Sequence, residues 1–332
     1  MNIININPKS ALPKYKQIVL SIDTAISEKQ LKINEKLPSI NKVCLAFSVS
    51  RDTVLLAYNE LKKRGVIYAI LGKGYYVKSI EFSFEKRYFL LFDELNIFKE
   101  DIYNSFLETI KNKAHVEIFF HHFNVNMFKK LVNESNGNYS KYIIMPCNLV
   151  GISNSIKSLP ANDVYILDQT NEDLTNYPSV HQNFAKDIYE GINIGHQKLQ
   201  NYQMLVLIFP GLKEPIGMVE GFEKFCKEYQ FDYQIISKFD HRAIIQGEVY
   251  IIIDDRHLVE VIEQSKNQDL VLGKDFGIIS YNETPLKKVV ANGITTISTD
   301  FRKMGKLLAK MTLSNSKVNI ENKSKLIIRN SL

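Results

Sequence analysis

Residues 37–77, LPSINKVCLAFSVSRDTVLLAYNELKKRGVIYAILGKGYYV, decide the fold of the N-terminal part of this chain. Pro38 suits the first turn of a helix, and Ser39 can cap its start before an apolar stripe that ends at Ser48. A second helix is expected from Ser50, because its hydroxyl can bond the backbone N–H groups near Thr53. The stretch therefore begins with two short helices separated by a tight break.

A β-hairpin is expected directly after the second helix. Lys62, Lys63 and Arg64 close that helix where its dipole favours cations, and Gly65 supplies a left-handed cap. The hydrophobic period then drops to two, which predicts strands over 66–70 and 75–78 joined across LGKG at 71–74. Two helices followed by a cation-tipped hairpin form the layout of a winged helix-turn-helix, which predicts binding to double-stranded DNA.

The first turn of the second helix is the part expected to enter the major groove, where side-chain donors contact base edges. We assign base reading to Arg51, phosphate or mixed contacts to its polar neighbours, and the minor groove or its backbone to the hairpin tip. The candidate DNA-binding residues are Ser39, Asn41, Lys42, Ser50, Arg51, Asp52, Thr53 and Lys73. The alternative for each one is a solvated surface residue, since exposed Ser, Thr and Lys are common.

Charge is distributed unevenly along the chain. Residues 1–79 hold 13 Lys plus Arg against 5 Asp plus Glu, a net charge of +8, whereas the remainder carries −2. A basic head on a nearly neutral body predicts that the head binds a polyanion. Each phosphate that its cations neutralise releases counterions, which strengthens binding at low salt.

Residues 11–78 resemble the winged helix-turn-helix of the GntR family of bacterial transcription regulators. The resemblance lies in ALPKYKQI, LPS, SVSRDTV, the AY.ELK..G pattern and GKGYYV. Many family members have arginine where this chain has Asn41 and Leu55, whereas Arg51 is kept. Asn41 can still pair with a base edge or a phosphate, but Leu55 cannot.

The rest of the chain predicts an α/β body in which buried parallel strands alternate with amphipathic helices. Strands are expected at 88–92, 116–120, 142–145, 164–167, 204–209, 233–236, 249–253 and 277–280, and helices at 100–112, 184–199, 217–229, 256–267 and 300–313. We expect a head over 1–79, a linker over 80–87 and a doubly wound body over 88–332.

Polar residues follow several of these strands, at the end of a doubly wound sheet where ligands bind. Carboxylates and amides there can hold a polar ligand, and an aromatic ring can stack on its apolar face. The candidate ligand-binding residues are Asp93, Glu94, Phe98, His121, Asp168, Gln169, Asp254, Asp255, Arg256 and Asn282. The alternatives are that Asp254 and Asp255 only cap a helix, and that His121 and His122 are structural or form a metal pair.

The body resembles the two-lobed, periplasmic-binding-protein-like effector domain of LacI-type regulators. VYIIIDDRHL, GIISYNETPL and ITTISTDFRKMGKLLAKM carry this likeness, although Met218 and Asn282 stand where relatives have Arg and Asp. The resemblance implies lobe one over about 88–180 plus 295–332, lobe two over about 181–294, and a ligand between them.

Together these features predict a transcription regulator, most simply a repressor, whose affinity for its operator is controlled by a small polar, sugar-like effector. We expect a homodimer, no catalytic residues, no metal and no cofactor. The three cysteines lack metal or disulfide spacing, and the absence of a leader and of a long apolar run predicts a cytoplasmic protein without membrane contact. The alternatives are an enzyme fused to the DNA-binding head, and a body that only dimerises.

Overall fold

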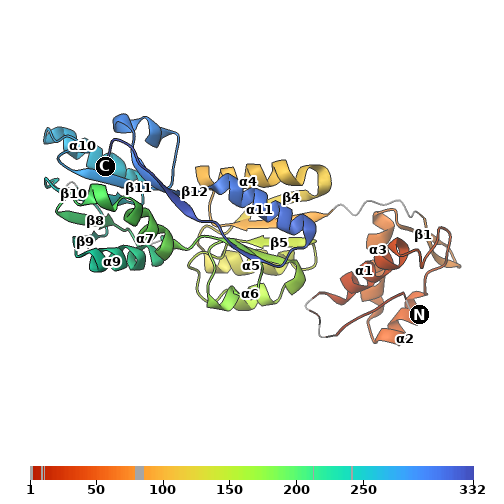
Figure 1. Ribbon diagram of the computed structural model, residues 1–332. Helices are drawn as coiled ribbons and strands as arrows, with labels where there is room; N and C mark the ends of the chain where they lie inside the picture. Colours follow the sequence, from red (N-terminus) through yellow and green to blue (C-terminus); the bar gives the residue numbers. More distant parts are fainter. Residues whose placement is uncertain (1–2, 9, 11, 79–85, 212, 241) are drawn as a thin grey trace.

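The computed structural model describes residues 3–8, 10, 12–78, 86–211, 213–240 and 242–332. Most of the expected linker lies outside these residues. The head (red to orange in Figure 1) consists of three helices and a two-stranded antiparallel sheet. Its elements are α1 (Lys14–Ser27), α2 (Ile40–Phe47), α3 (Arg51–Lys63), β1 (Ile67–Ile70) and β2 (Gly74–Val77).

The two predicted helix caps of the head are confirmed. The Ser39 hydroxyl accepts a hydrogen bond from Lys42 N at 3.3 Å, and the Ser50 hydroxyl accepts one from Thr53 N at 3.2 Å. Between the two helices, Ser48 takes a left-handed backbone with φ 50°, which ends α2. Helix α1 was not predicted from the sequence, and its apolar face packs with that of α3 to form the core of the head.

Asp23 of α1 is a buried carboxylate in this core, 2% exposed, and its Oδ2 lies 3.0 Å from Arg64 Nη1. Burial raises the pKa of Asp23 to about 6, although the Arg64 guanidinium lowers it. Because this value exceeds the ordinary 3.8, the folded head binds a proton that the unfolded chain has released, so stability falls as pH rises from about 4 through about 6.

Asp23→Asn is therefore expected to remove this pH dependence and to stabilise the head at neutral pH by up to about 3 kcal/mol. Chemical denaturation of the full chain at several pH values between 4 and 7.5 measures the effect. Glu28→Gln, at an exposed carboxylate at the end of the same helix, is the matched control and should follow wild type. Equal pH slopes for wild type and Asp23→Asn would contradict the assignment.

Lobe one is built on a six-stranded sheet in the order β13-β7-β6-β5-β3-β4. Alternate residues of its strands enter two hydrophobic cores: Tyr88, Leu90 and Phe92 pack with α4 and α11, whereas Phe89 and Leu91 pack with α5 and α6. This alternation is what a sheet covered on both faces requires. The elements are β3 (Arg87–Phe92), α4 (Ile97–Ile110), β4 (His115–Phe120), α5 (Val125–Ser135), β5 (Lys141–Ile144), α6 (Ser153–Lys157), β6 (Val164–Asp168), β7 (Ser179–His181), α11 (Phe301–Ser314) and β13 (Asn319–Glu321).

Lobe two repeats the plan with a six-stranded sheet in the order β14-β12-β11-β10-β8-β9. Helices α7 and α9 cover one face and α10 covers the other. The elements are α7 (Phe184–Ile194), α8 (His196–Leu199), β8 (Met204–Ile208), α9 (Gly217–Tyr229), β9 (Asp232–Ile236), β10 (Glu248–Ile252), α10 (Asp255–Asn267), β11 (Gly277–Tyr281), β12 (Thr295–Thr299) and β14 (Ser324–Ile327). Single turns of 3₁₀ helix lie at Lys111–Lys113, Ala161–Asp163, Glu172–Leu174, Leu286–Lys288 and Val290–Asn292.

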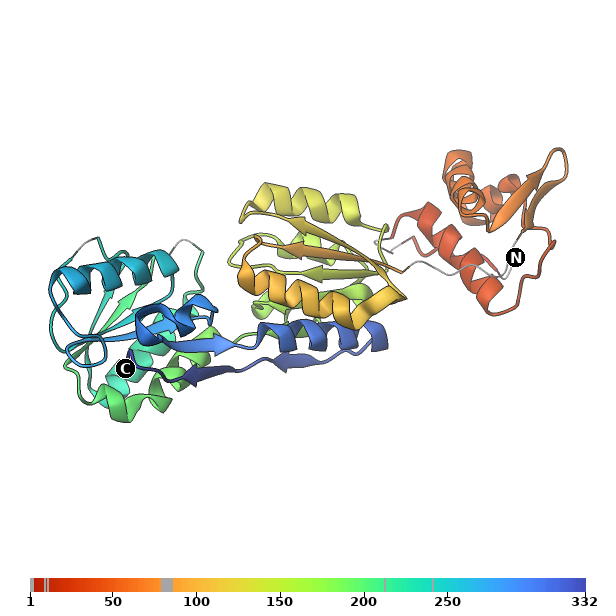
Figure 2. The ribbon, with the colours of Figure 1, turned by 90° about the horizontal axis from the view of Figure 1, so that it is seen from above.

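The chain crosses between the lobes at three places, which Figures 1 and 2 show as neighbouring segments. These crossings run from β7 to α7, from β12 to α11 and from β13 to β14. The boundary expected at 295 therefore needs correction, because β12 pairs with β11 in lobe two and β14 returns there to pair with β12. The final segment is shared between the lobes instead of belonging to lobe one.

Hydrogen bonds tie the three crossings to one another. Thr299 Oγ1 donates to Gln182 Oε1 at 2.6 Å, and Asn322 Nδ2 donates to the carbonyl of Asp300 at 3.0 Å. The backbone N–H of Asn322 also donates to the carbonyl of His181 at 2.8 Å. The three crossings thus form one hydrogen-bonded connection between the lobes, which we call the hinge.

Helices α4 and α11 approach closely beside this hinge. A Cβ on Gly305 of α11 would lie 2.2 Å from the carbonyl oxygen of Ile102 on α4, so only glycine permits the contact. The close packing fixes the position of α4, whose first turn faces the gap between the lobes. No helix in the part of the chain that the structure describes is long and apolar enough to cross a membrane.

Candidate functional site

The start of α3 presents Arg51 and Asp52 to solvent, and Thr53 is half-buried beside them. Ser39, Asn41 and Lys42 at the start of α2 are also exposed, as is Lys73 in the hairpin between β1 and β2. Ser50 is exposed too, but its hydroxyl serves the helix cap and lies 2.8 Å from Thr53 Oγ1. The structure therefore places the candidate DNA-binding residues at or near the surface of the head.

Asn41 has a contact that the sequence did not indicate. Arg51 Nη1 donates a hydrogen bond to Asn41 Oδ1 at 3.1 Å, across the break between α2 and α3. Because a long exposed arginine loses rotamer freedom when it binds, an amide that holds its guanidinium lowers that loss. Asn41 is thus placed to orient Arg51.

A second candidate site lies between the two lobes, in a cavity of about 300 Å³. Both lobes and the crossings contribute to its wall, at the carboxyl ends of several strands, where the doubly wound architecture predicts ligand binding. The lining residues are Asp93, Glu94, Asn96, Phe98, Lys99, Phe123, Cys147, Asp168, Gln169, Gln182, Phe184, Lys213, Glu214, Pro215, Met218, Ile253, Asp254, Asp255, Tyr281, Asn282 and Phe301.

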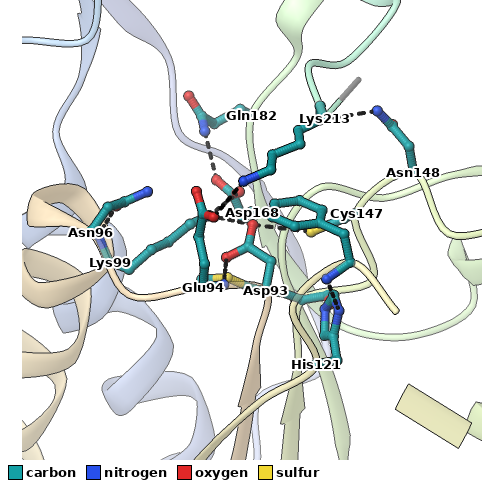
Figure 3. Close-up of polar contacts among 12 residues, drawn as sticks. Asp93, Glu94, Asn96, Lys99, His121, Cys147, Asn148, Asp168, Gln182 and Lys213 are labelled. Carbon is teal, nitrogen blue, oxygen red and sulfur yellow. Dashed lines mark hydrogen bonds and ion pairs between the residues drawn. The ribbon is translucent and has the colours of Figure 1, made fainter. Parts of the chain in front are cut away.

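The floor of the cavity on the side of lobe one is a buried ionic cluster (Figure 3). Lys99 is 7% exposed, and its ammonium lies 2.8 Å from Asp168 Oδ2 and 3.3 Å from Asp93 Oδ2. The Cys147 thiol donates to Asp93 Oδ2 at 3.1 Å, and Gln182 Nε2 donates to Asp168 Oδ1 at 2.6 Å. Since Gln182 also bonds Thr299, the cluster is joined to the hinge.

The protonation states of the cluster follow from its geometry. Burial alone would raise the pKa of Asp93, but the Lys99 ammonium and the Glu94 N–H and Cys147 donors lower it below its usual value. Burial would likewise lower the pKa of Lys99, yet Asp168 and Asp93 raise it. Burial and the Asp93 carboxylate both raise the pKa of the Cys147 thiol. At neutral pH the cluster therefore holds the Lys99 ammonium, the Asp93 carboxylate and a neutral Cys147 thiol.

Several cavity residues have an unusual backbone. Phe123, Cys147, Asp168 and Asn282 all have positive φ, between 50° and 73°. A left-handed conformation costs a non-glycine residue on the order of 1 kcal/mol or more, least for Asn and Asp, and such residues gather at ligand sites. Their collection around a single cavity supports assigning function to it.

Lys213 of lobe two reaches across the mouth of the cavity (Figure 3). Its ammonium lies 2.7 Å from Glu94 Oε2 and 4.6 Å from the centroid of the Phe123 ring, both in lobe one. Asn148 of lobe one donates to the carbonyls of Lys213 and Glu214 at 3.2 and 3.0 Å. These contacts connect the two lobes directly.

Most candidate ligand-binding residues line this cavity, but two do not. Asp93, Glu94, Phe98, Asp168, Gln169, Asp254, Asp255 and Asn282 form part of its wall. Several are already engaged: Glu94 pairs with Lys213, Asp255 Oδ1 lies 2.7 Å from the Lys287 ammonium, and Asp254 caps α10. Arg256 is exposed on the first turn of α10 outside the cavity wall.

His121 lies beneath the wall instead of lining it. Its ring is fully buried, its Nδ1 accepts from Phe123 N at 3.2 Å, and its Nε2 therefore carries the proton that bonds the Met145 carbonyl at 3.1 Å. Burial lowers the pKa of His121, which keeps it neutral. We therefore correct its role to supporting the turn that holds Phe123. No cluster of three or more His, Cys, Asp or Glu suited to a metal is found in the described part of the chain.

Five further residues of the cavity wall were not predicted from the sequence: Lys99, Cys147, Gln182, Lys213 and Tyr281. A signal existed only for Lys99: Asn96 caps α4 through Lys99 N, which puts a lysine in the first turn, where the helix dipole disfavours a cation. Such a lysine implies a nearby carboxylate. Gln182 and Lys213 lie in connecting segments, and nothing in their local sequence indicates that they join two lobes.

Comparison with known proteins bears on the head first. Residues 14–77 match the family model "Bacterial regulatory proteins, gntR family". These residues are a GntR-family DNA-binding domain. The chain is 32% identical over 75 residues to the HTH-type transcriptional repressor YtrA of Bacillus subtilis, and 39% identical over 69 residues to the arabinose metabolism transcriptional repressor of Geobacillus stearothermophilus. These matches cover 23 and 21% of the chain, and 58 and 19% of the relatives.

Beyond its GntR-type head, the chain has the fold of LacI-type repressors. A dimeric Lac repressor with a C-terminal deletion superposes with a TM-score of 0.63 at 17% identity, covering 74% of this chain and 98% of that one. The trehalose repressor from Escherichia coli gives a TM-score of 0.62 at 12% identity, covering 73 and 100%. These neighbours confirm the predicted two-lobed, periplasmic-binding-protein-like architecture of the body.

Proposed function

We propose that this protein is a transcription regulator, acting as a repressor, that binds operator DNA through its GntR-type head and releases it when a small polar, sugar-like metabolite binds between the lobes. The observation that carries the proposal is the combination of the two sites in one chain: a basic helix-turn-helix and a cavity at a hydrogen-bonded hinge. Each site alone is compatible with other functions.

The head supports the DNA half of the proposal. Arg51 stands exposed at the start of α3 and Asn41 is placed to orient it, while Lys42 and Lys73 add exposed positive charge to the same head. Arginine bidentate to guanine is the commonest specific contact in the major groove, and lysines on phosphates add affinity without sequence preference. Two heads held by a homodimer would contact half-sites about 34 Å apart.

The body supports the regulatory half. Its cavity combines aromatic rings with carboxylates and amides, the mixture that holds polyhydroxylated ligands. Because both lobes and the hinge contribute to the wall, a ligand that contacts both lobes favours one lobe arrangement over another. Two of the similar proteins are named as repressors for arabinose metabolism and trehalose, which makes sugars the first compounds to test.

Electrophoretic retardation of DNA from upstream of the gene, with the full-length protein, tests the proposal. We expect retardation that weakens steeply with salt, and release by a compound that also raises the melting temperature of the protein. The coupling should be about 1–3 kcal/mol, or about 5- to 150-fold in operator affinity. Failure to retard any duplex from its own genome at low salt, or retardation unaffected by every stabilising compound, would overturn it.

A further inference from the structure

The cavity between the lobes has an excess of negative charge. Six carboxylates line it, from Asp93, Glu94, Asp168, Glu214, Asp254 and Asp255, against the two lysines Lys99 and Lys213 in the wall and Lys287, which does not line the cavity but pairs with Asp255. The buried cluster uses two of the carboxylates on one ammonium, which leaves a net charge of −1 in the floor. An acidic ligand such as a phosphorylated sugar meets repulsion here, whereas a cation is attracted.

The aromatic rings of the cavity have the same preference. Phe98, Phe123, Phe184, Tyr281 and Phe301 all contribute to its wall. The face of an aromatic ring carries partial negative charge, and rings that surround a desolvated cation stabilise it. Carboxylates combined with aromatic rings are the surroundings in which proteins bind ammonium groups.

An ammonium group already occupies one such position. The Lys213 Nζ reaches from lobe two to the Glu94 carboxylate and the Phe123 ring of lobe one, at 2.7 and 4.6 Å. The side chain of Lys213 is half-exposed, so this pair is exchangeable with solvent and is held only weakly. Glu94 and Phe123 therefore form a cation site whose present occupant belongs to the opposite lobe.

Tyr281 provides an independent indication of a missing ligand. It is 3% exposed and lines the cavity at the end of β11, but its hydroxyl has no hydrogen-bond partner among the residues that the structure describes. Leaving a buried hydroxyl without a partner costs free energy, so a ligand group that forms a hydrogen bond with it recovers that cost. Burial and the nearby Asp187 and Asp168 carboxylates raise the pKa of Tyr281, which keeps the hydroxyl neutral.

We propose that the effector carries a positively charged amino group, as an amino-bearing polyol or a small amine does, and that this group takes the place of Lys213 between Glu94 and Phe123. The inference rests on the proposed function, because it specifies the class of ligand for the same cavity. When the amino group displaces the Lys213 side chain, the ion pair with Glu94 across the mouth is lost, whereas the Asn148 hydrogen bonds to the backbone of Lys213 and Glu214 remain. Lys213 thus links ligand binding to a change in the arrangement of the lobes.

Ligand class is tested with matched compounds that differ only in charge. The melting temperature of the full-length protein without DNA is measured with glucosamine, glucose and glucuronate, and with 1,4-diaminobutane, 1,4-butanediol and succinate, at constant ionic strength. We expect the cation of at least one set to raise it by about 1 °C or more, with no comparable effect of its neutral and acidic counterparts. A larger effect of a neutral or acidic compound, or no effect of either cation, overturns the inference.

The position of the ammonium group is tested by chemical rescue. Lys213→Ala should lower the melting temperature, and propylammonium chloride should restore part of the loss, whereas sodium chloride or propanol should not. Lys227→Ala, which removes an exposed lysine paired with Glu223 on α9 of the same lobe, is the matched control and should show no rescue. Adding Glu94→Gln to Lys213→Ala should abolish the rescue, and equal rescue in all variants overturns the assignment. Both experiments are independent of DNA, so their failure leaves the retardation result intact.

Discussion

Replacing Arg51 with alanine is expected to weaken binding of the full-length protein to its operator by about 5- to 150-fold, equivalent to about 1–3 kcal/mol. Arg51 stands exposed at the start of α3, the part of a helix-turn-helix that enters the major groove. Its planar guanidinium can donate two parallel hydrogen bonds to guanine, which no neighbouring side chain of α3 can do. The loss should appear in operator affinity and much less in affinity for unrelated DNA.

The test is to titrate operator DNA and an unrelated duplex with wild type, Arg51→Ala and Lys42→Ala. The comparison separates contacts to bases from contacts to phosphates. Lys42 is exposed near Arg51 on α2, and its loss should weaken both complexes alike and reduce the salt slope by about 1. If Arg51→Ala weakens both duplexes equally, Arg51 contacts phosphate and the base-reading role is wrong.

The hydrogen bond between Arg51 and Asn41 adds a second expectation for the same interface. Asn41→Ala should weaken operator binding in the wild-type background, because it removes the acceptor that holds the guanidinium. In the Arg51→Ala background the same change should have little effect, since a positioning residue acts only through the residue that it positions. An additive double variant would mean that Asn41 contacts DNA by itself.

The parts of the fold that sequence could predict are those whose pattern is local. Ser39 and Ser50 predict the starts of their helices, because a capping side chain bonds a backbone N–H only three residues away. Buried strands of four to six apolar residues, such as β3 and β8, are visible because both of their faces are covered. Strands β7 and β13 are short, and the pairing that makes them strands comes from distant parts of the chain.

The site shows the same limit. Seven of the eight candidate residues that line the cavity do so because they follow strands whose carboxyl ends meet there, and the eighth, Phe98, lies on α4. Lys99 was missed because the helix was expected to begin at 100, whereas α4 begins at Ile97 and turns Lys99 inward. His121 was predicted to line the cavity because it follows β4. The left-handed backbone of His122 and Phe123 decides which side chain of this turn faces the cavity, and the sequence does not reveal that conformation. Contacts between lobes, such as that of Lys213, have no local signal.

Replacing Lys99 with methionine is expected to destabilise the protein at pH 7 by about 3–5 kcal/mol. The variant keeps the length and packing of the side chain but leaves the carboxylates of Asp93 and Asp168 buried together without their cation. Removing one partner of a buried ionic cluster lowers the free energy of unfolding by far more than the intact cluster contributes to it. The remaining charges are then buried with neither water nor a counter-charge to stabilise them. The shift of the urea midpoint measures the loss.

Lys141→Met is the matched control in the same lobe, since Lys141 pairs with the single, partly exposed carboxylate of Asp163 and its loss should cost about 1 kcal/mol or less.

The pH dependence of stability gives a further check. In wild type the pKa of Asp93 is lowered, so its contribution to stability is present above about pH 4 and is lost as the pH falls below that. Lys99→Met lacks the cation that lowers the pKa of Asp93. Acidification from pH 7 should therefore reduce the difference in unfolding free energy between the variant and wild type. Adding Asp168→Asn should recover part of the loss at pH 7, because it removes one of the two unpaired charges. If Lys99→Met costs no more than Lys141→Met, the cluster is not the charged, buried floor that the cavity requires.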